Sequence, residues 1–282
     1  MDALVSSARR KGSAVVVGLD PDPRHLPPQV LKNASTEAGA VWEFCLGILE
    51  AVEHEAAVVK LQSAYFERLG PEGMAIYADL ISAARDLGLP TIADVKRGDI
   101  GPVAAAYAEA HLRVYGATSV TINPYMGADA VSPFLEEVRC LGDRGVFVLV
   151  ATSNPSAPDL QDSTVPPLYE AAAQLVNSLG QVGASGYTDA GAVVGATRPK
   201  VGRRVRELLP NALFLAPGYG AQKGDALGAG ALLDADGAGV LVNSSRGILR
   251  AFEAPGRGDY RSAARDAARW MREDLKGAGL RW

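Results

Sequence analysis

The segment Thr91-Ile92-Ala93-Asp94-Val95-Lys96-Arg97-Gly98-Asp99-Ile100-Gly101 is a short apolar run that ends in charged side chains and a glycine-marked turn. Successive side chains of a strand point to opposite faces, so we expect Asp94 and Lys96 on one face and Val95 on the other. Charges at a strand end are costly to desolvate unless they are paired, so the segment indicates a functional site there. Taken alone, the pattern is equally compatible with a solvated ion pair at the mouth of a loop.

Further apolar runs recur on both sides of this segment and predict the fold. The expected strands are 14–20, 57–61, 90–94, 119–123, 146–151, 192–195, 212–216 and 239–243. Apolar residues at helical spacing predict helices at 37–55, 74–87, 103–114 and 167–179. Continuous apolar runs suit parallel strands that are buried on both faces, and their alternation with helices over 282 residues predicts an α/β fold, a (β/α)8 TIM barrel with 1–282 as a single domain. An open doubly wound sheet is the alternative, although no Gly-x-Gly-x-x-Gly turn follows the first strand.

A last helix is expected at 260–275, with Trp270, Met271 and Leu275 as its buried face. The segments 22–40 and 155–167 are long insertions to which the sequence assigns no role.

Composition excludes several classes of protein. A net charge of −4 argues against a general nucleic-acid binder, and no apolar run is long enough for a membrane span. The N-terminus lacks the apolar core of a signal peptide, and Cys45 and Cys140 lack metal-ligand spacing, so we expect a cytoplasmic protein with idle thiols. His25, His54 and His111 belong to no ligand motif and are expected in structural or surface roles.

Polar residues follow the expected strands at the ends where this fold places its active sites. They include Asp20, Lys60, Asp94 with Lys96, Asn123, 152–154, 197–198, 217–225 and 243–247. The glycine-rich loop at 217–225 and the turn carrying Arg246 fall where the fold binds phosphate, because backbone N–H groups and a guanidinium both suit an anion. Gln222 can donate its amide to the same group. The alternative is that these glycines only form turns and Arg246 is a surface charge.

Several motifs occur together in one order: Gly18-Leu19-Asp20-Pro21, Val59-Lys60-Leu61-Gln62, 94–101, Asn123-Pro124-Tyr125-Met126-Gly127, 217–222 and Arg246-Gly247. This set resembles orotidine 5'-phosphate decarboxylase, a carboxy-lyase that makes UMP, in the longer bacterial form typical of actinobacteria. The resemblance extends over about 19–248 and implies that no metal or other cofactor takes part.

The resemblance also implies roles for individual residues. Lys60, Asp94, Lys96 and Asp99 match the family's alternating charge network, in which Lys96 protonates C6 of the pyrimidine and Asp94 faces the substrate carboxylate. Lys60 holds the network and a ribose hydroxyl. The implied substrate-binding residues are Asp20 for ribose, Ser153 for the pyrimidine, Gln222 and Arg246 for phosphate, and Ile100 and Asn123. Asp99, with Ile100 beside it, is expected to reach into the partner's site, so the enzyme would be a homodimer.

The chemistry fits these charges. Loss of CO2 from C6 leaves a carbanion that no adjacent π system delocalises, so fixed charges must stabilise it. An ammonium between two carboxylates stays charged, stabilises the carbanion and can donate the proton. One position departs from the pattern: Val103 stands where relatives commonly carry a Thr, which removes a hydroxyl expected near ribose.

Two other functions remain open at this point. A metal-dependent sugar-phosphate aldolase or decarboxylase of the same barrel shares Asp-x-Lys-x-x-Asp but needs an acidic metal ligand, and Lys60 stands at the second strand where we expect that acid. A non-catalytic nucleotide-phosphate binding protein would be expected to have lost part of the charge network, which is complete here.

Overall fold

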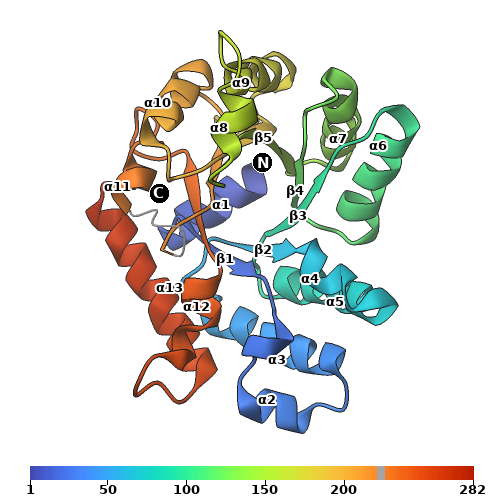
Figure 1. Ribbon diagram of the computed structural model, residues 1–282, viewed down its shortest axis with the longest axis vertical. Coiled ribbons are helices and arrows are strands. Elements are labelled where there is room, and N and C mark those ends of the chain that lie inside the picture. The colour runs from blue at the N-terminus through green and yellow to red at the C-terminus, as the bar shows by residue number, and fades with distance from the viewer. Residues whose placement is uncertain (221–225) are drawn as a thin grey trace.

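A computed structural model describes residues 1–220 and 226–282 of the chain. Eight parallel strands close into a barrel in chain order, and helices surround them (Figure 1). The strands are β1 (Val15–Leu19), β2 (Val58–Gln62), β3 (Thr91–Arg97), β4 (Ser119–Ile122), β5 (Gly145–Ala151), β6 (Ala190–Val194), β7 (Phe214–Ala216) and β8 (Val240–Ser244). The predicted (β/α)8 barrel is confirmed, and the open-sheet alternative is wrong because β8 pairs with β1.

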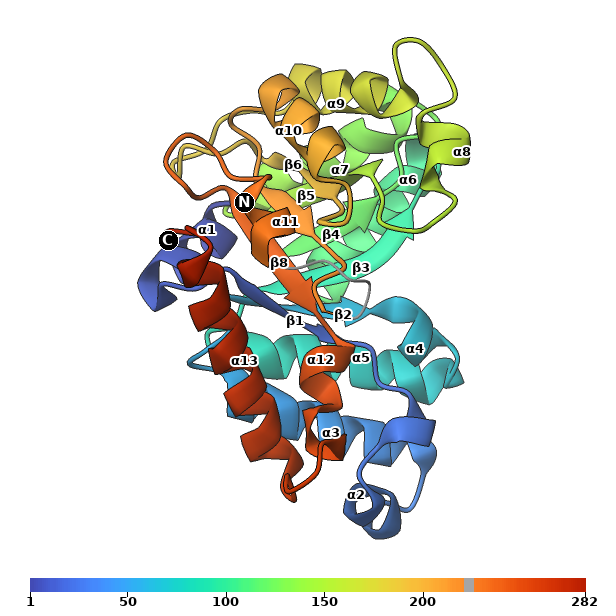
Figure 2. The ribbon, with the colours of Figure 1, turned by 60° about the vertical axis from the view of Figure 1, so that its left-hand side comes forward.

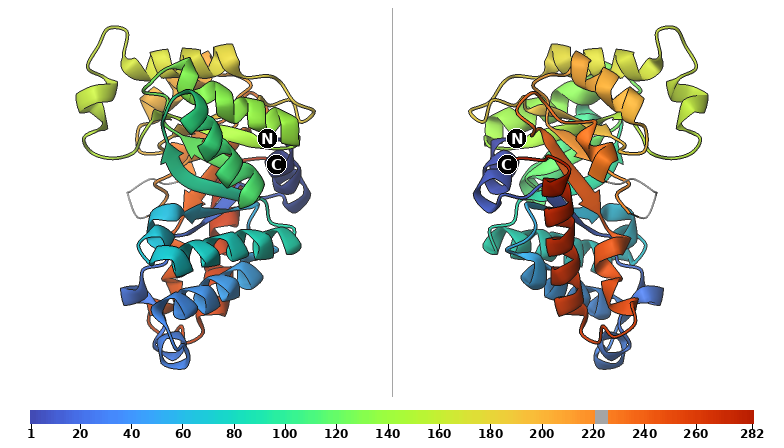
Figure 3. Two further views of the ribbon diagram at one scale, coloured as in Figure 1. Left: turned by 90° about the vertical axis from the view of Figure 1, so that its right-hand side faces the viewer. Right: turned by 90° about the vertical axis from the view of Figure 1, so that its left-hand side faces the viewer.

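The helices are α1 (Asp2–Lys11), α2 (Pro28–Asn33), α3 (Glu37–Val52), α4 (Ser63–Glu67), α5 (Gly70–Asp86), α6 (Gly101–Ala108), α7 (Ala128–Leu141), α8 (Ala157–Gln161), α9 (Leu168–Leu179), α10 (Pro199–Leu208), α11 (Ala226–Gly230), α12 (Arg246–Leu249) and α13 (Tyr260–Gly277). Short turns of 3-10 helix lie at Pro23–His25 and Ala251–Glu253, and a π-helix at Glu109–Val114 continues α6. In Figure 3 the insertion that contains α2 forms one end of the body, and the insertion that contains α8 projects sideways from the other half. Among the described helices, none has the length and apolar character needed to cross a bilayer.

The strand residues are buried on both faces, as their continuous apolar runs predict. In β1, Val15, Val17 and Leu19 join the large apolar cluster between the sheet and the surrounding helices. Val16 points into the barrel, where it joins Ile92, Phe147 and residues of α1 in a second cluster. Because α1 and these inward side chains fill the N-terminal end of the barrel, space for a ligand is left at its C-terminal end.

The last helix, α13, packs alongside α3 (Figure 2), with the rings of Phe44 and Tyr260 5.2 Å apart. Met271 and Leu275 are buried as predicted. Trp270 is 65% exposed, so its assignment to the buried face is wrong. Consecutive helical residues are about 100° apart around the axis, so Trp270 cannot share the face of Met271 and Leu275.

Candidate active site

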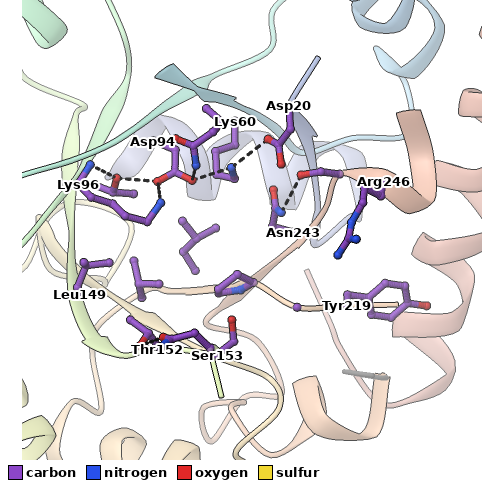
Figure 4. Close-up of a pocket in the computed structure, with 18 residues that line it drawn as sticks. Asp20, Lys60, Asp94, Lys96, Leu149, Thr152, Ser153, Tyr219, Asn243 and Arg246 are labelled. Carbon is purple, nitrogen blue, oxygen red and sulfur yellow. Dashed lines mark hydrogen bonds and ion pairs between the residues drawn. The ribbon is translucent and has the colours of Figure 1, made fainter. Parts of the chain in front are cut away.

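A cavity of about 420 Å³ lies at the C-terminal ends of the strands (Figure 4). Its volume lies within the range of small-molecule sites. It brings together the predicted residues Asp20, Lys60, Asp94, Lys96, Ser153 and Arg246. Other side chains in its wall are Gln62, Thr121, Leu149, Thr152, Asn154, Val193, Leu215, Pro217, Tyr219, Asn243 and Ser245. Residues that are far apart in the sequence therefore meet in one polar cavity.

Asp94 is the centre of the charge network. Lys60 Nζ donates to its Oδ2 at 2.7 Å, and Lys96 Nζ donates to its Oδ1 at 2.5 Å. Gln62 Nε2 donates to Oδ2 at 3.0 Å, and the Thr121 hydroxyl donates to Oδ1 at 2.9 Å. Each carboxylate oxygen thus accepts one charged and one neutral hydrogen bond, which fixes the orientation of the carboxylate.

The two lysines keep Asp94 charged, and Asp94 together with Asp20 keeps Lys60 charged. Burial alone would raise the pKa of Asp94, but the Lys60 and Lys96 ammonium groups outweigh burial and hold that pKa below its usual range. Burial would lower the pKa of Lys60, but Asp94 and Asp20 together raise it above its usual range. The buried network therefore carries full charges at neutral pH, whereas the Lys96 side chain, 46% exposed, extends into the open part of the cavity.

The backbone that carries Asp94 and Lys96 is not a regular strand. Ala93 pairs with Val120 and Arg97 pairs with Ile122, so three residues of β3 lie opposite Thr121 alone. Lys96 has a φ of 46°, in the left-handed region that residues other than glycine seldom adopt. The regular alternation expected from the sequence is therefore wrong between Asp94 and Lys96, although the predicted meeting of the two side chains is confirmed. The bulge directs Lys96 toward Asp94.

Asp20, the residue that follows β1, also joins the network. Its Oδ1 lies 3.7 Å from Lys60 Nζ, on the side of Lys60 away from Lys96 (Figure 4). Gly18 stands two residues before Asp20, in β1. A Cβ atom at position 18 would lie 2.0 Å from Ser245 Oγ and 2.9 Å from Asn243 Oδ1. Glycine at position 18 thus gives the polar residues at the end of β8 room beside Asp20.

Some predicted residues lie outside this cavity. Asp99 is half-buried and accepts a hydrogen bond from the N–H of Ile100, whose side chain is 52% exposed. Asn123 forms a local turn in which its Oδ1 accepts from Tyr125 N at 3.0 Å, and it lines a neighbouring apolar pocket. Gln222 lies outside the described residues. Within one subunit, the structure does not bring Asp99, Ile100 or Asn123 to the charge network.

Two polar residues of the cavity wall, Gln62 and Thr121, were assigned no role from the sequence, whereas Thr152 and Asn243 stand among the polar residues expected at the strand ends. Thr121 follows the alternation of inward polar and outward apolar residues in β4, and that signal could have identified it. Gln62 ends the motif Val59-Lys60-Leu61-Gln62, to which the sequence assigned a role only at Lys60. Thr152 is held by Gln161 of α8, which accepts from Thr152 N at 3.0 Å and donates to Thr152 Oγ1 at 2.6 Å. The 155–167 insertion therefore supports the rim of the cavity.

The arrangement suits chemistry in which fixed charges stabilise an anion. Two ammonium groups flank a buried carboxylate, and a guanidinium, that of Arg246, lies across the cavity (Figure 4). In residues 1–220 and 226–282, no group of three or more His, Cys, Asp or Glu side chains is placed to hold a metal ion.

The sequence and the fold both resemble those of known proteins. The sequence model of the family described as "Orotidine 5'-phosphate decarboxylase / HUMPS family" matches residues 13–256. An orotidine 5'-phosphate decarboxylase of Rhodopirellula baltica is 41% identical, over 95% of this chain and 96% of the relative. A relative of the same description from Clostridium kluyveri is 38% identical, over 98% and 96%. The solved structure of Leishmania donovani OMP decarboxylase has a TM-score of 0.80 and 35% identity, and 99% of each chain is covered.

Proposed function

The chain belongs to the orotidine 5'-phosphate decarboxylase family and converts orotidine 5'-phosphate to UMP and CO2 in pyrimidine biosynthesis, and from this premise we propose how its residues carry the reaction. The observation that carries the proposal is the buried Asp94 carboxylate, which is bonded by Lys60 and by Lys96 inside the cavity. Such a fixed set of charges needs little reorganisation when charge develops on the substrate.

In the proposed reaction, Lys96 is the proton donor. The bond between C6 and the carboxylate breaks, CO2 leaves, and the electron pair stays on C6. The Lys96 ammonium stabilises that carbanion and then transfers a proton from Nζ to C6, which completes UMP. The neutral amine regains a proton from water, which reaches it because the Lys96 side chain is 46% exposed.

Asp94 has two proposed roles. It holds Lys96 in place through the 2.5 Å hydrogen bond, and it faces the substrate carboxylate. Repulsion between two carboxylates would raise the energy of the bound substrate and would be relieved as CO2 departs. Because the lysines keep the pKa of Asp94 low, the carboxylate stays charged when the substrate's negative charge approaches.

The remaining cavity residues bind the rest of the substrate. Lys60 and Asp20 lie together at the end of the network and are assigned to ribose hydroxyls. Ser153 is assigned to the pyrimidine ring, and Arg246, with Gln222, is assigned to phosphate. Phosphate is remote from C6, so its binding energy contributes by orienting the reacting ring and excluding water.

We further propose that the working enzyme is a homodimer in which Asp99 and Ile100 complete the partner's site. Supporting this, Asp99 stands outside its own network, and large apolar side chains are exposed beside it. These are Ile100 at 52%, Val103 at 47%, Tyr125 at 77% and Met126 at 53%. The segments that carry them lie side by side, since Asn123 N donates to Arg97 O at 2.7 Å. A second copy would cover this surface and bring a carboxylate to Lys96.

Turnover of orotidine 5'-phosphate by the purified protein tests the proposal. We expect the ultraviolet absorbance of the substrate to fall and UMP to form in equal amount, as chromatography measures. Binding of UMP without any turnover would instead support the non-catalytic alternative. The cytoplasmic location, the membership of the longer bacterial form and the assignment of Asn123 to substrate stay predictions.

A further inference from the structure

We propose that Thr121 is the positioning residue that holds the β3 bulge and thereby aims Lys96 at C6. This inference rests on the proposed role of Lys96. Thr121 is 1% exposed and lies in β4 opposite the bulge, and its hydroxyl forms hydrogen bonds with three consecutive residues of β3. Nothing in its sequence motif indicated such a role.

The three hydrogen bonds use the whole bonding capacity of the hydroxyl. Thr121 Oγ1 accepts from Val95 N and from Lys96 N, each at 3.0 Å. A hydroxyl has two lone pairs and one hydrogen, so its hydrogen is left for Asp94 Oδ1, 2.9 Å away. The direction of every bond follows from this count, without any assumption about where the hydrogen lies.

The hydroxyl replaces an interrupted part of the backbone ladder. Regular pairing stops at Ala93 and resumes at Arg97, so the N–H groups of Val95 and Lys96 do not bond backbone carbonyls of β4 in the regular pattern. Thr121 Oγ1 supplies their acceptor and holds Lys96 at its φ of 46°. A left-handed lysine persists only where its surroundings over-determine it, and this contact provides part of that constraint.

The same hydroxyl couples the backbone of Lys96 to the side chain that its ammonium contacts. Asp94 Oδ1 accepts from both Thr121 Oγ1 and Lys96 Nζ. Loss of the hydroxyl would therefore release the bulge and one restraint on Asp94 together. The proton donor would still be present, but it would be poorly aimed, which lowers the rate of proton transfer more than it lowers substrate affinity.

Thr121→Val tests this because it keeps the shape and removes the hydroxyl. We expect kcat to fall roughly 10- to 100-fold, the effect of losing hydrogen bonds to a charged site, with KM changed less than about 3-fold. Thr121→Ser keeps the hydroxyl and should recover kcat to within about 5-fold of the wild type. An equal loss in Thr121→Ser and Thr121→Val would overturn the proposal, as would an unchanged kcat in Thr121→Val.

Thr118, the residue before β4, offers a matched control at the same pair of strands. Its Oγ1 accepts from Thr91 N at 3.1 Å, at the end of β3 and β4 remote from the cavity. Thr118→Val should therefore keep kcat near the wild-type value. If it loses as much activity as Thr121→Val, a general weakening of the β3–β4 pairing explains the effect and the proposal fails. If Thr121→Val does not fold, the pair Thr121→Ala and Thr121→Ser makes the same comparison of hydroxyl absent and present.

Hydrogen exchange at C6 separates positioning from direct contact with the substrate carboxylate. UMP has no carboxylate, yet removal of its C6 proton in D2O passes through the same carbanion and uses the same lysine in reverse. The probe is 5-fluoro-UMP, because the electron-withdrawing fluorine stabilises the carbanion and makes the exchange fast enough to measure. We expect Thr121→Val to slow exchange by a factor similar to its loss in kcat. Normal exchange with slow decarboxylation would show that Thr121 acts on the substrate carboxylate and would overturn the proposal.

Lys96→Ala in the same assays separates this inference from the proposed function. If Lys96→Ala keeps both activities, the role of Lys96 fails, and the role of Thr121 fails with it. If Lys96→Ala loses both activities while Thr121→Val keeps both, only the role of Thr121 fails.

Discussion

Oδ1 of Asp94 lies 2.5 Å from Nζ of Lys96, although the backbone between the two residues bulges out of the regular strand. On a regular strand, side chains two residues apart point to the same side. The bulge interrupts that regularity between Asp94 and Lys96, and the left-handed φ of Lys96 turns its side chain back toward Asp94. The contact therefore depends on the bulge, and the bulge depends on contacts from the neighbouring strand. This dependence links the fold to the proposed chemistry.

Lys96→Ala should abolish turnover and leave the fold intact. The substitution removes the proposed proton donor, and we expect kcat to fall at least about 1,000-fold because general acid catalysis and charge stabilisation are both lost. Circular dichroism and thermal unfolding check the fold. Lys32→Ala, an exposed lysine of α2, is the control and should match the wild type. Substantial turnover by Lys96→Ala would remove Lys96 from the role of donor.

Arg246→Ala should weaken substrate binding more than it slows the chemical step. A guanidinium–phosphate contact contributes through charge-assisted hydrogen bonds, so we expect KM for orotidine 5'-phosphate to rise roughly 10- to 100-fold. Initial rates at varied substrate concentration measure the change. Arg265→Ala, an exposed arginine on α13, should leave KM unchanged. If Arg246→Ala binds substrate normally, the phosphate lies elsewhere.

Removal of divalent metal distinguishes the proposed reaction from the metal-dependent alternative. Lys60 and Lys96 supply the positive charge beside Asp94, so activity should be unchanged after dialysis against EDTA. A metal-dependent sugar-phosphate aldolase assayed in parallel would show that the chelation is effective. Loss of turnover that Mg²⁺ restores would contradict the assignment of the charge network.

His111 should make the stability of the fold depend on pH. Burial, with a smaller contribution from Arg97, lowers the pKa of His111 from 6.5 to about 4. Between pH 4 and pH 6.5, His111 is protonated in the unfolded chain and neutral in the folded chain. The stabilising contribution is therefore complete above pH 6.5 and is lost as pH falls through 4, by about 3 kcal/mol in the free energy of unfolding.

Urea unfolding at several pH values measures this contribution. His111→Phe should flatten the fall in the free energy of unfolding between pH 6.5 and 4, whereas His54→Asn, at an exposed position, should leave it unchanged. A pH dependence that is the same in all three proteins would assign the effect to other groups.

The barrel can be predicted from the sequence because each strand is marked by residues that are adjacent in the chain. Each buried strand is a continuous apolar run, and polar residues such as Asp20, Lys60 and Arg246 follow at the strand ends, where the fold brings them together. Contacts that depend on irregular backbone could not be read in the same way. The hydrogen bonds of Thr121 require the bulge in β3, and a pattern of alternating residues contains no sign of a bulge.

The assignment of Asn123 to substrate stays a prediction. Its motif suggested a contact with substrate, but its side chain closes a turn with Tyr125 and faces a neighbouring pocket. Asn favours such local hydrogen bonds to its own backbone, and they compete with any longer contact. Asp99 and Ile100 differ from Asn123, because their proposed partner is a second subunit.

Activity of mixed dimers tests the central claim, a site divided between two subunits, most directly. Lys96→Ala and Asp99→Ala subunits are each expected to be inactive alone. When they are mixed by unfolding and refolding together, each heterodimer contains one site with both defects and one site with neither. Native mass spectrometry measures the heterodimer fraction. We predict turnover that rises in proportion to this fraction, to about half the wild-type rate per heterodimer. Heterodimers without turnover would contradict the account, because Asp99 would then serve its own subunit.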